Sequence, residues 1–266
     1  MQLIIEATLV IAAAGIVAYI GRFLDWKGSV AGGSLGYLYY IFGGRLHFAV
    51  VLIFLVVGGF ATRFKYRRKY GERGRGVRGW TNVIANGGVA ASIAVLAHAL
   101  GMDSRVGVAM FVGAISAAFT DTMATEVGML SKSKPVMLTT FKRTEAGSPG
   151  AVTALGLAGS LLAPLSIFIV FTLFGGGYLS ESGLVPWLLL MMATGFTGSL
   201  FDSLVGGLIQ SRYRCVECGR LVEVRRHCGK PTQHLSGVPY INNDVVNILA
   251  TIFGASLGYS LAPYLF

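Results

Sequence analysis

The feature that most limits the fold of this chain is a series of long apolar runs that contain almost no charge. Several approach the roughly 20 residues that a helix needs to cross the hydrocarbon core of a bilayer. Only 13% of the 266 residues are charged, whereas soluble domains carry roughly 25%. A soluble helical protein would have charged faces on its helices, and these runs have no such face. The sequence therefore predicts an all-α, polytopic integral membrane protein that forms a single transmembrane domain over residues 1–266.

The apolar runs predict about eight transmembrane helices, and the pattern is compatible with seven to nine. The second run is short and rich in glycine, so a tilted or re-entrant segment is an alternative there. The first run is expected to be a retained helix, because Glu6 stands where a cleavable signal peptide has basic residues. The expected spans are 2–20, 29–44, 46–62, 82–101, 105–126, 149–174, 184–210 and 244–264.

Basic residues lie almost entirely in alternate loops. Of the 22 Lys and Arg residues, only Arg45 and Arg105 fall in the other set of loops. Cytoplasmic loops of membrane proteins carry an excess of Lys and Arg. The loops after the first, third, fifth and seventh spans are therefore predicted to be cytoplasmic, with both termini outside and the chain in the cytoplasmic membrane.

Four carboxylates are expected near the inner boundary of the membrane. Asp121 lies roughly 24 Å along the fifth span from Arg105, and Asp202 lies roughly 27 Å along the seventh, at about 1.5 Å per residue. Asp244 opens the eighth span, and Glu126 lies about 140° round the helix from Asp121. Ionisable groups at this depth are costly unless they face the bundle interior and have a partner. Because Mg²⁺ favours carboxylate oxygens, the pattern predicts Mg²⁺ binding by Asp121, Glu126, Asp202 and Asp244.

Polar neighbours accompany these acids. Ser199 shares a helix face with Asp202, and Asn243 and Asn247 are four residues apart. Because asparagine is a favourable N-cap residue, capping of the last helix is the alternative to a ligand role for Asn243 and Asp244.

A candidate phosphate site precedes the sixth span. Ser148 is expected as an N-cap with Pro149 as the first helical residue, and Gly150 frees the backbone of that turn. A helix start of this kind exposes unpaired N–H groups to a phosphate, and Lys142 and Arg143 come just before it. The alternative is an ordinary capped helix with two cations that only set the topology.

Two asparagines at the start of the fourth span, Asn82 and Asn86, share one helix face at the same depth. Their amides suit contacts with ribose, base or phosphate. The alternative is that they tie neighbouring helices together.

All three cysteines lie in the expected cytoplasmic loop 212–242. In a reducing compartment, a Cys-x-x-Cys pair followed by His and Cys indicates metal binding before a disulfide. We expect a structural Zn²⁺ site, with free thiols as the alternative. The candidate ligands are Cys215, Cys218 and Cys228, with either His227 or His234.

Four stretches resemble, in order, the motif series of the family called Transmembrane Protein Nineteen. They are "RGWTNVIANGG", "FTDTMATEVGMLSKSKPVMLTTFKRTEAGSPGAV", "GSLFDSLVGGLIQ" and "GVPYINNDVVN". That family includes the phytyl-phosphate kinases of plant chloroplasts and is distantly similar to dolichol kinases and CDP-diglyceride synthases. The cysteine cluster is absent from many of its members, so the resemblance does not imply a catalytic role for the cysteines.

The resemblance implies a Mg²⁺-dependent kinase that transfers the γ-phosphoryl group of CTP, or of another nucleoside triphosphate, to an isoprenyl monophosphate. The four acids would hold Mg²⁺ and the triphosphate, while Lys142 and Arg143 would offset phosphate charge. The expected partners are the isoprenyl phosphate, the nucleotide and the membrane; nucleic acid is not among them, and a homodimer is left open. The alternatives are a cytidylyltransferase that makes a CDP-lipid and, from a different class, a cation or organic-phosphate transporter. Transporter sites usually lie near the bilayer midplane between repeats, and no repeat is visible here.

Overall fold

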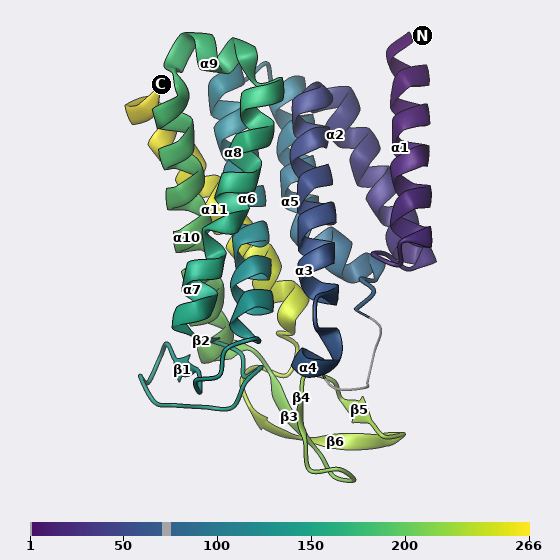
Figure 1. Ribbon diagram of the computed structural model, residues 1–266, viewed down its shortest axis with the longest axis vertical. Helices are drawn as coiled ribbons and strands as arrows, with labels where there is room; N and C mark the ends of the chain where they lie inside the picture. The colour runs from purple at the N-terminus through teal and green to yellow at the C-terminus, as the bar shows by residue number, and fades with distance from the viewer. Residues whose placement is uncertain (1, 71–75) are drawn as a thin grey trace.

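The computed structural model describes residues 2–70 and 76–266, and long helices dominate it. Within the described residues, seven helical segments are long and apolar enough to span a membrane. They stand beside one another along the long direction of the molecule (Figure 1), which confirms a helical polytopic membrane fold. The segments are α1 (Gln2–Ile20), Trp26–Arg63, α5 (Trp80–Ala99), α6 (Ser104–Gly128), Ala154–Phe174, α10 (Leu184–Ile209) and α11 (Asn243–Leu265).

The second segment is a helical hairpin. It contains 38 residues, and a straight helix of that length would measure roughly 57 Å, nearly twice the hydrocarbon core. The helix breaks at Gly44, whose φ of 73° lies in the left-handed region. The Phe48 ring lies 5.6 Å from the Tyr40 ring, so the chain reverses direction between them (Figure 1). The expected spans 29–44 and 46–62 are therefore the two arms of one segment. Its elements are α2 (Trp26–Ile53), the π-helical turn η1 (Phe54–Gly58) and α3 (Gly59–Arg63).

The sixth expected span begins later than predicted and is bent. It consists of α7 (Ala154–Ser160) and α8 (Leu162–Phe174), which meet at Leu161. Two short helices were not predicted: α4 (Tyr66–Tyr70) and α9 (Gly176–Ser182).

Two small antiparallel sheets depart from the all-α prediction. β1 (Val136–Met137) pairs with β2 (Ala151–Val152). The second sheet has the order β4-β3-β6-β5 and lies in the segment that was expected to be only a Cys/His loop. Its strands are β3 (Arg212–Cys215), β4 (Leu221–Val222), β5 (Arg226–His227) and β6 (Lys230–Ser236).

The loops expected to be basic gather at one end of the molecule. The connections after α1, α3, α6 and α10 lie at the same end as both sheets, and the two chain termini lie at the opposite end (Figure 1). Of the basic residues expected there, Arg73 and Arg75 lie outside the described residues. We call this end the basic end.

The central helix is α6, and every residue from Phe111 to Thr120 is buried. Close approach of its neighbours depends on small residues, as is common for helices in membranes. A Cβ atom added to Gly254 of α11 would lie 2.4 Å from the carbonyl oxygen of Gly113. The buried stretch ends at the basic end, where Asp121 is the next residue.

Candidate functional site

Two of the predicted acids line one cavity at the basic end, which we call the acid cavity. Asp121 follows the buried stretch of α6, and Asp202 comes from α10. Ser199 donates a hydrogen bond from Oγ to Asp121 Oδ1 at 3.4 Å. Asp202 is only 9% exposed, and no described residue forms a hydrogen bond with its Oδ2 atom. A buried carboxylate oxygen without a protein partner is costly, and the donor set suits a hard cation such as Mg²⁺.

The segment 146–153 forms another wall of the acid cavity. Gly150 has a φ of 77°, and a Cβ atom there would lie 2.5 Å from the Ser203 carbonyl oxygen of α10. Glycine therefore lets this segment approach α10 next to Asp202. Ser148 lines the same cavity, and its Oγ lies 3.2 Å from Thr144 Oγ1.

The predicted helix start at Ser148 is wrong. The N-cap of α7 is Thr153, whose Oγ1 accepts a hydrogen bond from the Gly156 N–H at 3.0 Å. The physical reason is the pairing of β2 with β1, because extended residues 151–152 cannot belong to a helix that starts at Pro149. Ser148 and Gly150 therefore reach the cavity as part of a turn before a strand.

Lys142 and Arg143 are not brought to the acids. They line a separate pocket with Arg212, Thr139 and Thr144. Both follow β1 in a tight turn, where the Met137 N–H donates to the Lys142 carbonyl oxygen at 2.9 Å. This turn directs the two cations away from the acid cavity.

A second polar cavity adjoins the first, and we call it the amide cavity. Asn82 and Asn86 of α5 line it together with Asn247 of α11. Asn86 Nδ2 donates to the Asn82 carbonyl oxygen at 2.9 Å. Asp121 and Asn243 line both cavities, so the asparagines of two helices lie beside the acids, as their shared depth predicts.

Glu126 lines the amide cavity but not the acid cavity. Its carboxylate forms an ion pair with Lys69 Nζ of α4, and the two side chains are 8% and 0% exposed. Lys69 Nζ also donates to the Ala61 carbonyl oxygen at 2.6 Å. A protein cation thus balances the charge of Glu126, unlike that of Asp202.

Asp244 lies in the first turn of α11 and lines neither cavity. The N-cap of this helix is Asn242, whose Oδ1 accepts from the Val245 N–H at 3.1 Å. The capping alternative for Asn243 and Asp244 is therefore wrong, because both already belong to the helix. Asp244 remains close enough to the acid cavity to repel the carboxylate of Glu223.

The family model described as Integral membrane protein DUF92 matches residues 9–255. The chain belongs to this family. An uncharacterized membrane protein of Methanocaldococcus jannaschii is 30% identical and covers 94% of this chain and 90% of its own length. Protein PGR of Arabidopsis thaliana is 29% identical over 99% and 97% of the two chains. Protein VTE6, chloroplastic, also of Arabidopsis thaliana, is 24% identical over 91% and 66%. No solved structure matches the chain.

These matches confirm the family-level resemblance drawn from the four motifs. They extend it along nearly the whole chain, from α1 to α11. Integral membrane location is therefore a property of the DUF92 family and of this chain.

Sequence reasoning missed Glu223 of this DUF92 protein, which follows β4 and lines the acid cavity. The surrounding protein raises the pKa of its carboxyl group, and the nearby Asp244 carboxylate raises it further. Arg212 and a hydrogen bond with Gln210 act in the opposite direction. Glu223 is nevertheless exposed to water. No periodicity in its loop signals this position, since the fold of the small sheet brings it there.

Arg78 is the second missed residue. It lies just before α5 and lines the amide cavity, where its Nη2 atom donates to Thr62 Oγ1 at 3.4 Å. Burial lowers the pKa of its guanidinium, whereas the Glu126 carboxylate raises it. A guanidinium stays charged in proteins, so Arg78 supplies a positive charge beside the amides. In the sequence it is hidden among the many basic residues of its loop.

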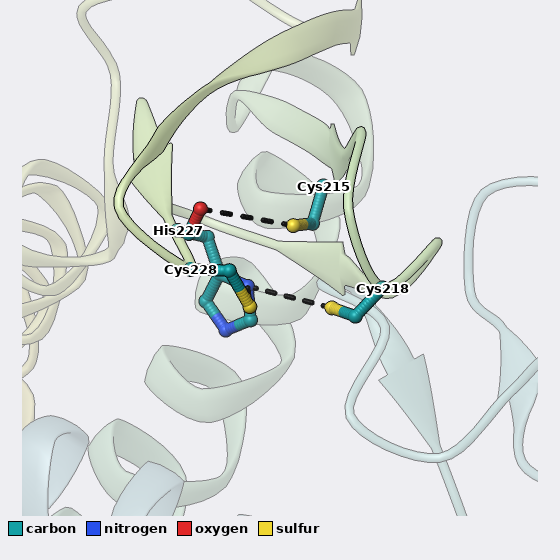
Figure 2. Close-up of side chains that lie close together, drawn as sticks. All are labelled: Cys215, Cys218, His227 and Cys228. Atoms are coloured by element: carbon teal, nitrogen blue, oxygen red, sulfur yellow. Dashed lines mark hydrogen bonds between the residues drawn. The ribbon is translucent and has the colours of Figure 1, made fainter.

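The four predicted zinc ligands also come together in this DUF92 protein. Cys215, Cys218, His227 and Cys228 form one cluster in the small sheet (Figure 2). None of them lines the acid cavity or the amide cavity.

Proposed function

We propose that this protein is a membrane-embedded isoprenyl-phosphate kinase that uses CTP or another nucleoside triphosphate with Mg²⁺. One observation carries the proposal: an apolar groove and the polar amide cavity share Arg78, Asn82 and Asn86 in their walls. A substrate with a long apolar tail and a phosphate head would place its tail in the groove and its phosphate in the cavity.

The apolar groove lies between α1, the two arms of the hairpin and the start of α5. Its walls are almost entirely apolar, and Gly32, Gly33 and Gly36 leave space where side chains would stand. Helix α1 contributes Ile11 to these walls, and the two arms of the hairpin contribute Leu35 and Leu52. Burial of apolar surface stabilises a bound hydrocarbon by about 25 cal/mol per Å², so this groove suits the isoprenyl tail.

The phosphate head of such a substrate would meet Arg78, Asn82 and Asn86. Arginine binds phosphate through parallel N–H donors, and the two amides add further donors. Asp121 forms part of the walls of both cavities, so the path from acceptor phosphate to triphosphate is short.

The acid cavity is the proposed site of the triphosphate and Mg²⁺. Asp121 and Asp202 would hold the metal, with Glu223 as a further carboxylate and Ser199 fixing Asp121. When bound, Mg²⁺ would neutralise charge on the phosphoryl oxygens. This assignment reduces the predicted set of four acids, because Glu126 already has Lys69 as its partner and Asp244 lies outside the cavity.

In the proposed reaction, an oxygen of the isoprenyl monophosphate attacks the γ-phosphorus. The bond from that phosphorus to the β–γ bridging oxygen breaks, and the bridging oxygen leaves with the electron pair as part of the nucleoside diphosphate. The acceptor is already an anion, so no side chain has to remove a proton from a hydroxyl group. Arg78 would lower the repulsion between the two phosphate groups as they approach.

The similarity to Protein VTE6, chloroplastic, and the resemblance to a family that includes phytyl-phosphate kinases support this reaction type. We place the active site at the cytoplasmic face, because the basic loops gather at the end that holds both cavities.

The test uses purified full-length protein in nanodiscs with Mg²⁺, geranylgeranyl monophosphate or phytyl monophosphate, and each nucleoside triphosphate. Mass spectrometry should detect isoprenyl diphosphate and a nucleoside diphosphate, with CTP as the first donor to examine. Asp202→Asn should lower the turnover at least about 100-fold, since metal stabilisation of phosphoryl charge is worth several kcal/mol. The matched control is Glu181→Gln at the opposite end, which should leave turnover unchanged.

Other outcomes of this experiment would indicate a different function. Pyrophosphate together with a CDP-lipid would identify a cytidylyltransferase that uses the same cavities. Folded protein that turns over no nucleotide but moves divalent cations or organic phosphates across vesicles would identify a transporter.

A further inference from the structure

The small sheet at the basic end contains a cluster of four side chains with metal-binding atoms. One ligand atom from each of Cys215, Cys218, His227 and Cys228 lies within 4.8 Å of the other three. We propose that these four side chains bind one Zn²⁺ ion, which holds the sheet together. The cysteine pair comes from the turn between β3 and β4, and the His–Cys pair from the β5–β6 hairpin (Figure 2).

The distances agree with a tetrahedral site. Zn²⁺ lies ~2.3 Å from cysteine sulfur and ~2.0 Å from histidine nitrogen, so a sulfur and a nitrogen on one ion stand roughly 3.5 Å apart. His227 Nδ1 lies 3.5 Å from Cys218 Sγ and 3.3 Å from Cys228 Sγ. Three sulfurs and one imidazole nitrogen form a common donor set of structural zinc sites.

The first of the two ligand turns is closed by glycine. After the Cys-x-x-Cys pair, Gly219 has a φ of 68°, and its N–H donates to the Cys215 carbonyl oxygen at 2.9 Å. This hydrogen bond folds the turn so that both cysteines are on the same side of it.

The second turn places a cysteine in an unusual conformation. Cys228 and Gly229 connect β5 to β6 with φ values of 53° and 75°. A two-residue hairpin with two positive φ values normally takes Asn or Asp followed by Gly, and a positive φ is uncommon for other residues. A coordinated thiolate would offset the conformational cost of cysteine at this position.

The sheet also needs a stabilising element that its own side chains do not supply. Of the residues in its four strands, only Tyr213 and Cys215 are buried. Short strands without an apolar core are marginal in water, and small metal-binding units commonly obtain their folding energy from the ion. Four protein ligands leave no open position on the metal, so the proposed role is structural.

His234 is the alternative fourth ligand in the sequence, and the structure separates it from the cluster. It lies on β6 opposite Tyr213, with the two rings 5.2 Å apart. His227 and His234 therefore form a matched pair of variants, one inside the proposed site and one outside it.

The experiment uses full-length protein that has been purified with a peptide tag other than polyhistidine and without chelators. Elemental analysis should find one zinc ion per chain. Exchange with Co²⁺ should produce the absorption of a tetrahedral cobalt–thiolate centre. His227→Ala should lose the zinc on gel filtration, whereas His234→Ala should keep it.

Several outcomes would overturn the proposal. Wild-type protein without stoichiometric zinc, a different stoichiometric metal such as iron, or a Cys215–Cys218 disulfide in non-reduced protein would each do so. Full retention of zinc by His227→Ala would exclude His227 as a ligand. If His227→Ala does not fold, the metal content and cobalt spectrum of the wild-type protein still decide the matter.

Discussion

At the residue scale, the buried charges fall into two classes. The Glu126 carboxylate has a protein cation, Lys69, as its partner. Asp202 has one carboxylate oxygen that no described residue satisfies. Burial of an unpaired charge is costly. We therefore assign a structural role to Glu126 and leave Asp202 as the acid that can bind a ligand. Both acids stand near the ends of apolar helices, and only their neighbours distinguish them.

The Lys69–Glu126 pair gives a stability prediction. Lys69→Met removes the cation that forms the buried ion pair with Glu126 and should destabilise the protein by about 3–5 kcal/mol. The double variant Lys69→Met/Glu126→Gln removes both charges and should recover much of that loss. The measurement is thermal unfolding in detergent.

The control for this prediction is the Glu217–Lys230 pair, whose side chains are 51% and 60% exposed. Lys230→Met should change stability by less than about 1 kcal/mol, because water screens an exposed pair. If the two lysine variants are equally stable, the burial argument for Lys69 is wrong.

At the element scale, helix packing depends on close backbone contacts. α6 and α11 approach each other at Gly113 and Gly254, and this contact places Asp121 of α6 near Asn243 and Asn247 of α11. Membrane helices associate mainly through van der Waals packing, and small residues strengthen this packing because they let the two backbones approach closely.

A larger residue at this contact should disturb it. Gly254→Val places atoms within 2.4 Å of the Gly113 carbonyl oxygen, and overpacking of this kind costs about 1–3 kcal/mol. Gly15→Val on α1 is the matched substitution, because no atom lies within 4 Å of a Cβ at Gly15. Melting temperatures in detergent should fall for the first variant only, and a similar fall in both would indicate a general effect of valine.

At the scale of the whole molecule, the reversal at Gly44 determines where the ends of the chain lie. It turns one 38-residue segment into two arms, so both termini lie at the end opposite to the sheets (Figure 1). The basic loops share the other end, which also holds both cavities. The basic loops and the two polar cavities therefore lie at the same end of the bundle.

This arrangement predicts the topology. Alkaline phosphatase fused after Phe266 should be active in bacterial cells, and green fluorescent protein at the same point should be dark. Fusions after Ser133, at the basic end, should behave in the opposite way. The expectation follows from the excess of Lys and Arg in cytoplasmic loops. A fluorescent fusion after Phe266 would contradict the assignment of both termini to the outside.

Local sequence signals predicted much of the fold. The spans of α1, α5, α6, α10 and α11 follow directly from apolar runs, because a membrane helix satisfies its backbone hydrogen bonds within the segment. The depth of Asp121 and Asp202 also follows, since a helix advances about 1.5 Å per residue. The prediction failed at Ser148, because residues 151–152 just after it pair as a strand with residues 136–137. Capping patterns report only on neighbouring residues and carry no information about such pairing.

The sequence by itself determined the membrane fold, the separation of charge between the two ends and the level of the acids, because each depends on local composition and helical rise. Only the tertiary structure decided which groups face each other. It paired Glu126 with Lys69, moved Lys142 and Arg143 away from the acids, and brought Glu223 and Arg78 to the cavities. These relations join residues far apart along the chain, and they depend on how helices rotate and loops fold when they pack together. No local pattern in the sequence specifies that packing.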